Sequence, residues 1–314
     1  MTTSYSAPAK IILFGEHAVV YGQPAIAVPI SGLRAFATIE PSPPDQPGLR
    51  LVAEDLQQTF HLETVDADNA LAATVDIILQ HLQVPPPSVT IRLRSAIPIA
   101  SGLGSGAAIA AVLGRALSAA ANLSLSDDAL NTVVYAVETL HHGTPSGIDN
   151  TVVVYEQPVY FVRGKPIETL HVKHPLQLVI ADTGQPAPTH IAVGDVRKLV
   201  EAHPEQAGPV IEGIGQLVSQ ARQALSQGEI ALLGQLMTDN HTLLQQLTIS
   251  SADLDHLVQT ALEAGAVGAK MSGGGRGGNM IALVSETTGA QVERALRAAG
   301  AVRTFKTVVH PCGP

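Results

Sequence analysis

Apolar and polar positions alternate at the start of the chain, and this pattern predicts strands. Residues 4–14 alternate and then become continuously apolar up to Gly15-Glu16-His17, which predicts a strand that ends at a functional turn. Residues 18–30 are rich in strand-forming residues but are interrupted by Tyr21-Gly22-Gln23-Pro24, which indicates a hairpin. Further strands are predicted over residues 35–40, 49–52, 59–62 and 88–93.

Apolar residues at helical spacing predict helices between and after these strands. Residues 69–82 follow a period near 3.6, and the prolines at 85–87 end that helix. A second helix covers residues 109–122 and follows a glycine-rich loop. Ser126 is the predicted N-cap of a third helix, over residues 127–141, which ends at Gly143.

The remaining segments divide the chain into two parts of different character. Residues 143–149 are predicted to be irregular, and residues 151–155 and 159–162 to form a hairpin. From about residue 165 the pattern predicts strands over 176–182, 267–271, 279–284 and 302–309, and helices over 189–203, 209–227, 229–247, 253–264 and 289–299. We therefore predict an α+β chain of two domains, residues 1–165 and 166–314.

A loop of small residues, Pro98-Ile-Ala-Ser-Gly-Leu-Gly-Ser-Gly-Ala-Ala108, opens the second helix. Amides at 105–108 would be unpaired donors at the positive end of the helix dipole, and the three glycines would let an anion approach the main chain. A polyphosphate would fit this site. A tight turn without a ligand is the alternative, because a match to G-x-G-x-x-[GA] is a weak signal by itself.

A dinucleotide site is a weaker interpretation of the same loop. That fingerprint needs the first strand of a βαβ unit and an acidic residue about 20 positions further on. Asp127 and Asp128 lie at about that distance, but Ser124-Leu-Ser-Asp-Asp128 is typical of a helix cap. The sequence has no G-x-x-x-x-G-K-[ST], so ATP would bind without a P-loop.

The composition is that of an ordinary soluble α/β or α+β chain. Its 314 residues are 46% hydrophobic and 14% charged, with no Trp, which is enough apolar material for two cores. The net charge of −9, without a basic block, argues against nucleic-acid or acidic-membrane partners. A single cysteine, Cys312, and the lack of a signal-like or membrane-spanning apolar segment lead us to expect a cytoplasmic protein.

Four segments punctuated by glycine carry most of the unusual polar residues. Lys10 lies in an otherwise apolar strand, so it should have a carboxylate or phosphate partner unless it is an edge lysine whose ammonium group reaches solvent. Asp149, in a loop of Gly, Pro and Ser, could simply cap a turn. Glu138 and His142 are four residues apart, as in a pair on a helix surface. Each residue alone leaves both interpretations open.

Together and in this order, the segments resemble the motifs of the GHMP kinase superfamily and, within it, of the mevalonate kinases. The residues that carry the resemblance are Ala7-Pro-Ala-Lys-Ile-Ile-Leu-Phe-Gly-Glu-His-Ala-Val-Val-Tyr-Gly22, Pro98 with Gly102-Leu-Gly-Ser105, Glu138 with His142-Gly-Thr-Pro-Ser-Gly-Ile-Asp-Asn150, and Gly268-Ala-Lys-Met-Ser-Gly-Gly-Gly275. Asp182-Thr-Gly184, Asn240 and Asp253-Leu254 also match, so the resemblance extends over nearly the whole chain.

The resemblance implies a two-domain GHMP kinase fold with a left-handed βαβ unit in the N-terminal domain and a ferredoxin-like C-terminal domain. ATP and Mg²⁺ would occupy a cleft between the domains. The implied activity is phosphorylation of the primary hydroxyl of mevalonate. The left-handed crossover would be an exception to the usual right-handed rule.

The resemblance also implies roles for individual residues. Asp149 would take or orient the hydroxyl proton, and Lys10 would lie against Asp149 and the hydroxyl. Glu138 and Ser105 would bind the metal. The other implied contacts are Pro98, Ser101, Gly102, Leu103, Gly104, Ser105, Gly106 and Ala107 for the phosphates; Lys10, Glu16, His17, Ser146, Asp149 and Thr189 for the substrate; and Ser272, Gly273 and Gly274 in a loop that closes over the site.

Two positions depart from the pattern of the superfamily. Gly106 stands where a second serine usually helps to bind the metal, so Ser105 or a water would have to replace it. Arg276 lies inside the last glycine-rich loop and would either reach a phosphate or be a solvated charge. The oligomeric state stays open, with a homodimer among the options.

Other functions remain as alternatives. The nearest are sister kinases that act on phosphomevalonate, on mevalonate at its 3-hydroxyl, or on homoserine. A decarboxylase relative is less favoured because Lys10 and Asp149 are both present, and a non-catalytic ligand sensor because Lys10, Glu138 and Asp149 are all retained. A nicotinamide oxidoreductase is the third choice.

Overall fold

The computed structural model describes residues 3–66, 68–99, 101–143, 145–166, 168–187 and 189–311, without the side chains of His142 and His190. Cys312 and the predicted Glu138–His142 pair therefore lie outside what it describes. Contacts divide the chain into two compact units. Unit 1 contains the residues up to Ala9 with Leu33–Ile99 and Gly104–Glu156, and unit 2 contains Lys10–Gly32, the loop residues up to Leu103, and the chain from Gln157. The domain boundary after residue 165 stays a prediction.

Unit 1 is a sheet covered by four helices. Its elements are β1 (Thr3–Phe14) and β2 (Ala25–Pro41), which both continue into unit 2, then β3 (Arg50–Ala53), η2 (Glu54–Leu56), β4 (Gln58–His61), α1 (Ala70–Leu82), β5 (Val89–Ser95), α2 (Ser105–Ala120), α3 (Asp127–His142) and α4 (Ile148–Tyr155). The strand order is β4-β3-β5-β2, and β1 pairs with β2. Strands β3 and β5 run parallel, whereas β5 pairs antiparallel with β2.

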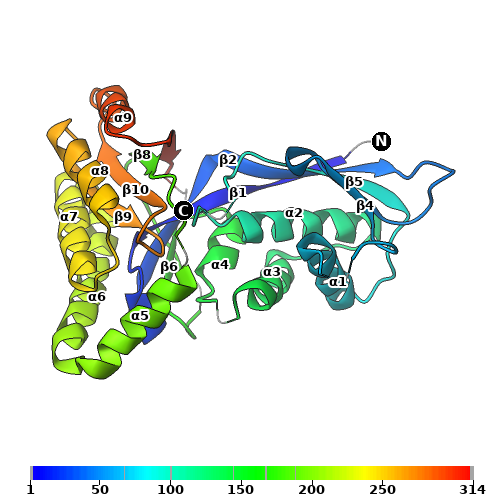
Figure 1. Ribbon diagram of the computed structural model, residues 1–314, viewed down its shortest axis with the longest axis horizontal. Coiled ribbons are helices and arrows are strands. Elements are labelled where there is room, and N and C mark those ends of the chain that lie inside the picture. Colours follow the sequence, from blue (N-terminus) through cyan, green and yellow to red (C-terminus); the bar gives the residue numbers. More distant parts are fainter. Residues whose placement is uncertain are drawn as a thin grey trace. The chain divides into compact units, whose positions relative to one another are not determined.

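The helices of unit 1 all lie on one face of this sheet, with α2 in contact with α1, α3 and α4 (Figure 1). Local sequence signals explain where they begin. The Asn69 side chain accepts hydrogen bonds from Leu71 N and Ala72 N at the start of α1, and Ser126 accepts one from Ala129 N at the start of α3. Helix α2 has no side-chain cap, because the residue before it is Gly104.

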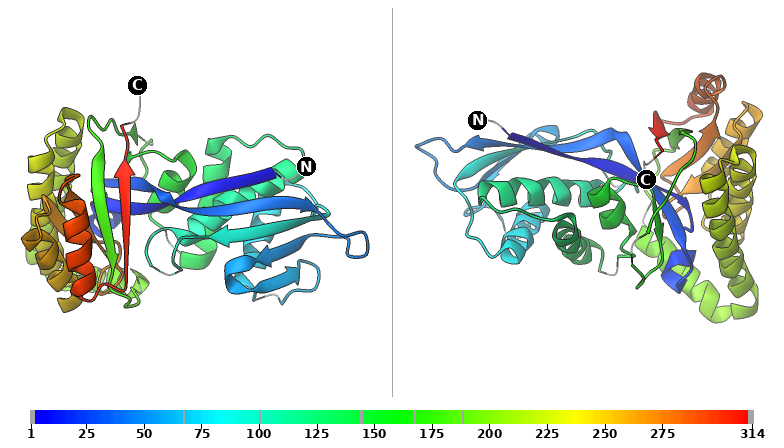
Figure 2. Two further views of the ribbon diagram at one scale, coloured as in Figure 1. Left: turned by 90° about the horizontal axis from the view of Figure 1, so that it is seen from above. Right: turned by 180° about the vertical axis from the view of Figure 1, so that it is seen from behind.

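Unit 2 contains a four-stranded antiparallel sheet. Its elements are η1 (Ala18–Tyr21), β6 (Val159–Phe161), β7 (Glu168–Thr169), β8 (Leu176–Asp182), α5 (Thr189–Ala202), α6 (Pro204–Gln227), α7 (Ile230–Gln246), α8 (Ala252–Glu263), β9 (Gly268–Ser272), β10 (Asn279–Val284), α9 (Gly289–Ala298) and β11 (Arg303–Val309). The strand order is β11-β8-β10-β9, and Figure 2 shows β11 beside β8. This is the order of a ferredoxin-like βαββαβ unit, as predicted.

Helices α7, α8 and α9 pack against this sheet, and α6 packs against α7. Strand β6 is separate from it and pairs with the first residues of β2, with Ala25 opposite Phe161. Strands and helices occur in both units, so the α+β fold class is confirmed. No helix in the described ranges is long and apolar enough to cross a membrane.

Four predictions about the elements were wrong. Residues 18–21 form the 3₁₀ turn η1, and β2 continues through Ser31 and Gly32 where two strands were predicted. Residues 151–155 belong to α4 rather than to a strand, because the helix starts after Gly147 and buries Val152–Val154 against α2 and α3, which overrides their strand propensity. Helix α6 starts at Pro204, five residues before the predicted start, so Pro209 lies inside it.

Two glycines allow α7 and β9 to approach closely. A Cβ on Gly234 would lie 2.3 Å from the Val267 carbonyl oxygen, and a Cβ on Gly268 would lie 2.1 Å from the Gly234 carbonyl oxygen. Both obstacles are backbone atoms in paired or helical segments, which cannot move independently. The contact between α7 and β9 therefore depends on these glycines.

We expect Gly234→Ala to destabilise the chain by about 1–3 kcal/mol, because overpacking forces the helix away from the strand. Gly208→Ala in α6 is the matched control: its Cβ meets nothing within 4 Å, so the gain in helix propensity should stabilise by up to about 1 kcal/mol. Urea unfolding measures both. If Gly234→Ala had the same free energy of unfolding as the wild type, α7 and β9 would not be closely packed at this position.

Candidate active site

The predicted site residues form two groups, one in each unit. Unit 1 holds Pro98, Gly104, Ser105, Gly106, Ala107, Glu138, Ser146 and Asp149. Unit 2 holds Lys10, Glu16, His17, Ser101, Gly102, Leu103, Thr189, Ser272, Gly273 and Gly274. Each group is built from segments that are far apart in the sequence, and the two groups are described separately below.

The glycine-rich loop turns directly into helix α2. Gly102 and Gly104 have positive φ angles of 77° and 74°, which suit glycine, and the helix begins at Ser105. The first helical hydrogen bond runs from Ala108 N to Gly104 O, at 3.0 Å. The amides of residues 105–107 consequently have no acceptor within the helix, and Gly106 is exposed. This geometry suits an anion such as a phosphate.

Glu138 lies beside this helix start. It is on α3, is only 4% exposed, and its Oε1 would be 3.0 Å from a Cβ built on Gly106. The φ angle of Gly106 is not positive, so its backbone conformation does not require glycine. The absence of a side chain at Gly106 instead leaves room for the Glu138 carboxylate. The structure thus brings the predicted metal ligand Glu138 to the first turn of α2, next to Ser105.

Asp149 and Ser146 share one tight turn. Gly147, with a φ of 94°, precedes α4, and Asp149 is in the first turn of that helix and half-buried. Ser146 Oγ accepts a hydrogen bond of 3.3 Å from Ile148 N. Asn150, on the next position, donates to Asn131 Oδ1 at 2.7 Å and so fixes α4 against α3. A carboxylate at a helix N-terminus is favourably placed in the helix dipole.

Lys10 occupies a buried position in β1, in unit 2. It is 4% exposed, and its main-chain N–H donates to Leu103 O at 3.0 Å, which joins β1 to the glycine-rich loop. Burial raises the pKa of Glu16, and the positive charge of Lys10 slightly opposes that rise. Lys10 belongs to unit 2 and Asp149 to unit 1, so their direct pairing stays a prediction.

Glu16 forms a fully buried ion pair with Lys270 of β9. Lys270 Nζ also donates to Met271 O at 2.6 Å. Burial raises the pKa of Glu16 and lowers the pKa of Lys270, and each charge opposes the shift of the other. Lys270 had no predicted role of its own, although a lysine between Ala269 and Met271 in an apolar strand is the same kind of signal as Lys10.

His17 connects the turn after β1 to the last glycine-rich loop. Its ring is 6% exposed, and Nε2 donates to the Gly274 carbonyl at 3.0 Å, while Nδ1 is buried with no hydrogen-bond partner within the described ranges. Burial lowers the pKa of His17 to about 4, which the Gly274 hydrogen bond opposes and the Arg276 charge reinforces. A Cβ on Gly274 would lie 2.6 Å from Thr189 Oγ1, so the structure brings these predicted residues together.

The loop between β9 and β10 is held at several further points. Ser272 Oγ donates to Ile12 O at 2.8 Å, and Asn279 donates through its amide to the Ser101 carbonyl. Arg276 is not a free solvated charge, because its guanidinium pairs with Asp195 of α5. Asn279 and Asp195 gave no signal in the sequence, because their partners are distant along the chain.

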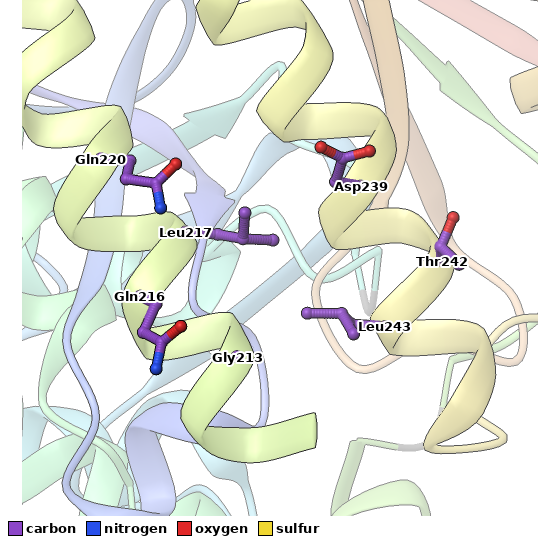
Figure 3. A pocket seen from close by; sticks show the side chains of 7 residues that line it. All are labelled: Gly213, Gln216, Leu217, Gln220, Asp239, Thr242 and Leu243. Carbon is purple, nitrogen blue, oxygen red and sulfur yellow. The ribbon is translucent and has the colours of Figure 1, made fainter. Parts of the chain in front are cut away.

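A groove of about 350 Å³ lies elsewhere in unit 2, between α6 and α7 (Figure 3). Leu217 and Leu243 point toward one another across it. The lining residues are Gly213, Gln216, Leu217, Gln220, Asp239, Thr242 and Leu243. None of them is a predicted site residue, so the groove is not part of the candidate active site.

Comparison with known proteins identifies the family. The family described as GHMP kinases N terminal domain matches residues 69–157, and that described as GHMP kinases C terminal matches residues 221–302. The mevalonate kinase of Thermococcus sibiricus is 36% identical over 94% of this chain and 92% of its own length.

Solved structures agree along the whole length. The L. major mevalonate kinase in complex with R-mevalonate superposes with a TM-score of 0.87 at 32% identity, covering 100% of this chain and 98% of that one. The Methanococcus jannaschii mevalonate kinase gives a TM-score of 0.86 at 28% identity, with 98% of each chain covered. The resemblance of the motifs is thus confirmed, and the chain belongs to the mevalonate kinase family of GHMP kinases.

Proposed function

We propose that this chain transfers the γ-phosphoryl group of ATP to the primary hydroxyl of mevalonate and forms 5-phosphomevalonate for isoprenoid synthesis. The observation that carries this proposal is the full-length similarity to a mevalonate kinase that was solved with R-mevalonate. The retained Lys10, Glu138 and Asp149 support a catalytic chain rather than a ligand sensor. The same matches favour mevalonate over the acceptors of the sister kinases.

In the proposed reaction, the acceptor oxygen forms a bond to the γ-phosphorus while the bond from that phosphorus to the ADP oxygen breaks. Asp149, at the start of α4, takes or orients the proton of the hydroxyl. The Lys10 ammonium group stabilises the negative charge that develops on the acceptor oxygen. Neither side chain needs to form a covalent intermediate.

The phosphates of ATP bind at the start of α2 in this proposal. The amides of residues 105–107 supply donors, and the helix dipole favours the negative charge. Gly102 and Gly104 take the positive φ angles that bring the loop backbone close to the ligand. Pro98, Ser101, Leu103 and Ala107 complete the proposed phosphate loop.

The residues beside this loop fit a magnesium ion. Glu138 presents a buried carboxylate to the first turn of α2, and Ser105 adds a hydroxyl on that turn. Mg²⁺ takes few protein carboxylates and fills its octahedron with phosphate oxygens and waters, so one carboxylate is sufficient. When bound, the ion would neutralise charge on the phosphates. Glu138 and Ser105 would hold it.

The acceptor is proposed to bind near the turn after β1. His17 is uncharged at neutral pH because of its low pKa, so it would offer hydrogen-bonding capacity rather than charge. Thr189 and Ser146 supply hydroxyl groups, and Glu16 orients the turn through its pair with Lys270. The segment Ser272–Gly274 is proposed to be the loop that closes the site over the acceptor, and the His17–Gly274 hydrogen bond holds it to the turn after β1.

The setting of the reaction is also a proposal. A single cysteine and the use of ATP support a reducing cytoplasm, and the net charge of −9 supports small-molecule partners rather than nucleic acids or membranes. A homodimer stays an open prediction.

A screen of ADP release over mevalonate, phosphomevalonate, homoserine and galactose tests the proposed function. We expect turnover with mevalonate and product phosphorylated at the primary hydroxyl. Asp149→Asn and Lys10→Met should each lower kcat by about 10²-fold or more, with the KM for ATP little changed, because each removes one acid–base or electrostatic group. Turnover with another acceptor and none with mevalonate would refute the assignment, and near wild-type kcat in both variants would remove these residues from the chemistry.

Magnesium titrations test the placement of the metal. We expect Glu138→Gln to raise the Mg²⁺ concentration for half-maximal rate at least about tenfold and to lower kcat, because it removes the one carboxylate. Ser105→Ala should have a smaller effect, since water can replace a hydroxyl. Gly106→Ser should be tolerated, because φ is not positive and the Glu138 carboxylate can shift slightly. A larger loss in Ser105→Ala than in Glu138→Gln would mean that the metal lies elsewhere.

The pH dependence of stability tests the buried state of His17. The pKa of His17 is about 4 in the folded chain, below the ordinary value of 6.5. The contribution of neutral His17 to the free energy of unfolding is therefore complete above pH 6.5 and is lost as the pH falls toward 4. Between pH 7.5 and 5 the loss is about 2 kcal/mol. His17→Asn, whose side-chain amide is a hydrogen-bond donor without a titrating group, should lack this loss in urea unfolding at the two pH values. Equal losses in both chains would show that the pKa of His17 is not lowered by folding.

A further inference from the structure

Arg276 adopts a backbone conformation that favours glycine. Its φ is 61°, the preceding Gly275 has a φ of 80°, and Gly278, two residues further on, has a φ of 72°. The left-handed region is unfavourable for a residue with a side chain by roughly 1–2 kcal/mol. An arginine at this position therefore needs interactions that offset the strain.

Three contacts hold Arg276 in place. Its N–H donates to the Ile249 carbonyl at 2.7 Å, and its Nε lies 3.4 Å from the Thr248 carbonyl, both in the turn between α7 and α8. Its guanidinium pairs with the Asp195 carboxylate of α5. The side chains of Arg276 and Asp195 are each 33% exposed, so water reaches the ion pair but does not fully surround it.

The same loop meets the same helix at a second point. Helix α5 begins at Thr189, and Gly274 approaches Thr189 so closely that a Cβ would lie 2.6 Å from its hydroxyl. The Gly274 carbonyl also accepts the hydrogen bond from His17. The loop is therefore fixed to α5 at Gly274 by close packing and at Arg276 by charge.

We propose that the Arg276–Asp195 ion pair is a latch that positions the glycine-rich loop on α5, so that Gly274 stays against Thr189 and His17. The proposal rests on the proposed function, since these are elements placed around the acceptor. A loop ordered in advance loses less entropy when the acceptor binds. The latch thus acts on acceptor binding, and Arg276 and Asp195 are positioning residues rather than catalytic ones.

Steady-state kinetics on three variants test the latch. Asp195→Asn and Arg276→Gly should raise the KM for the acceptor about two- to five-fold, the range of a partly exposed ion pair, with kcat within about twofold of the wild type. The double variant should be no worse than either single one, because both remove the same interaction. Lys198→Gln is the matched control: Lys198 Nζ contacts Asp195 Oδ1 at 3.1 Å but does not touch the loop, so its KM should not change.

Hydrogen exchange of the free chain gives a readout without substrate. Amides of residues 272–278 should exchange about two- to five-fold faster in Asp195→Asn and Arg276→Gly than in the wild type or Lys198→Gln. Trypsin should also cleave after Arg276 faster in Asp195→Asn. Arg276→Gly should melt no lower than the wild type, because glycine relieves the strained φ.

Unchanged KM and unchanged exchange in both variants would overturn the latch. The latch would also be overturned if both variants melted at a lower temperature and lost kcat and acceptor binding to the same extent, because such a result would indicate a purely structural role. If the wild type does not phosphorylate mevalonate, the proposed function falls, whereas the exchange experiment still decides whether the latch exists.

Discussion

The buried ion pair between Glu16 and Lys270 is the constraint on which the unit 2 part of the site depends. Neither side chain is exposed, and each charge alone in the interior would cost several kcal/mol. The partners are 254 residues apart, so their pairing joins the turn after β1 to the middle of β9. That junction sets His17 and the loop after β9 next to each other. Removing one partner would leave a buried charge, at a cost of about 3–5 kcal/mol.

Burial also decides which polar groups carry charge. His17 lies in the interior with one hydrogen bond to a carbonyl, so the neutral ring is favoured. Arg276, in the loop between β9 and β10, always carries its charge and pairs with the partly exposed Asp195 carboxylate. One glycine-rich loop is therefore attached by a neutral hydrogen bond at one end and by an ion pair at the other.

Glycine serves two different physical purposes in this chain. At Gly102 and Gly104 it supplies positive φ angles, which lead the loop into α2 and leave the first amides of that helix available. At Gly106, Gly234 and Gly268 it supplies space: for the Glu138 carboxylate in the first case, and for the contact of α7 with β9 in the other two. The phosphate loop combines both: its backbone turns at Gly102 and Gly104, and the Glu138 carboxylate lies close to Gly106.

Local signals in the sequence determined most of the fold and the membership of the candidate site. Periodicity and the Ser126 cap predicted nearly all helices and strands, and the ordered motifs identified the family and the ferredoxin-like unit. Local propensity failed for Val152–Val154, because burial against α2 and α3 outweighs strand preference. The partners of Glu16 and Arg276 were decided only by the tertiary structure. A charged residue in an apolar segment or a glycine-rich loop indicates in the sequence that it needs a partner, but not which one. Lys270 is 254 residues from Glu16, and Asp195 is 81 residues from Arg276, so only folding brings these groups into contact.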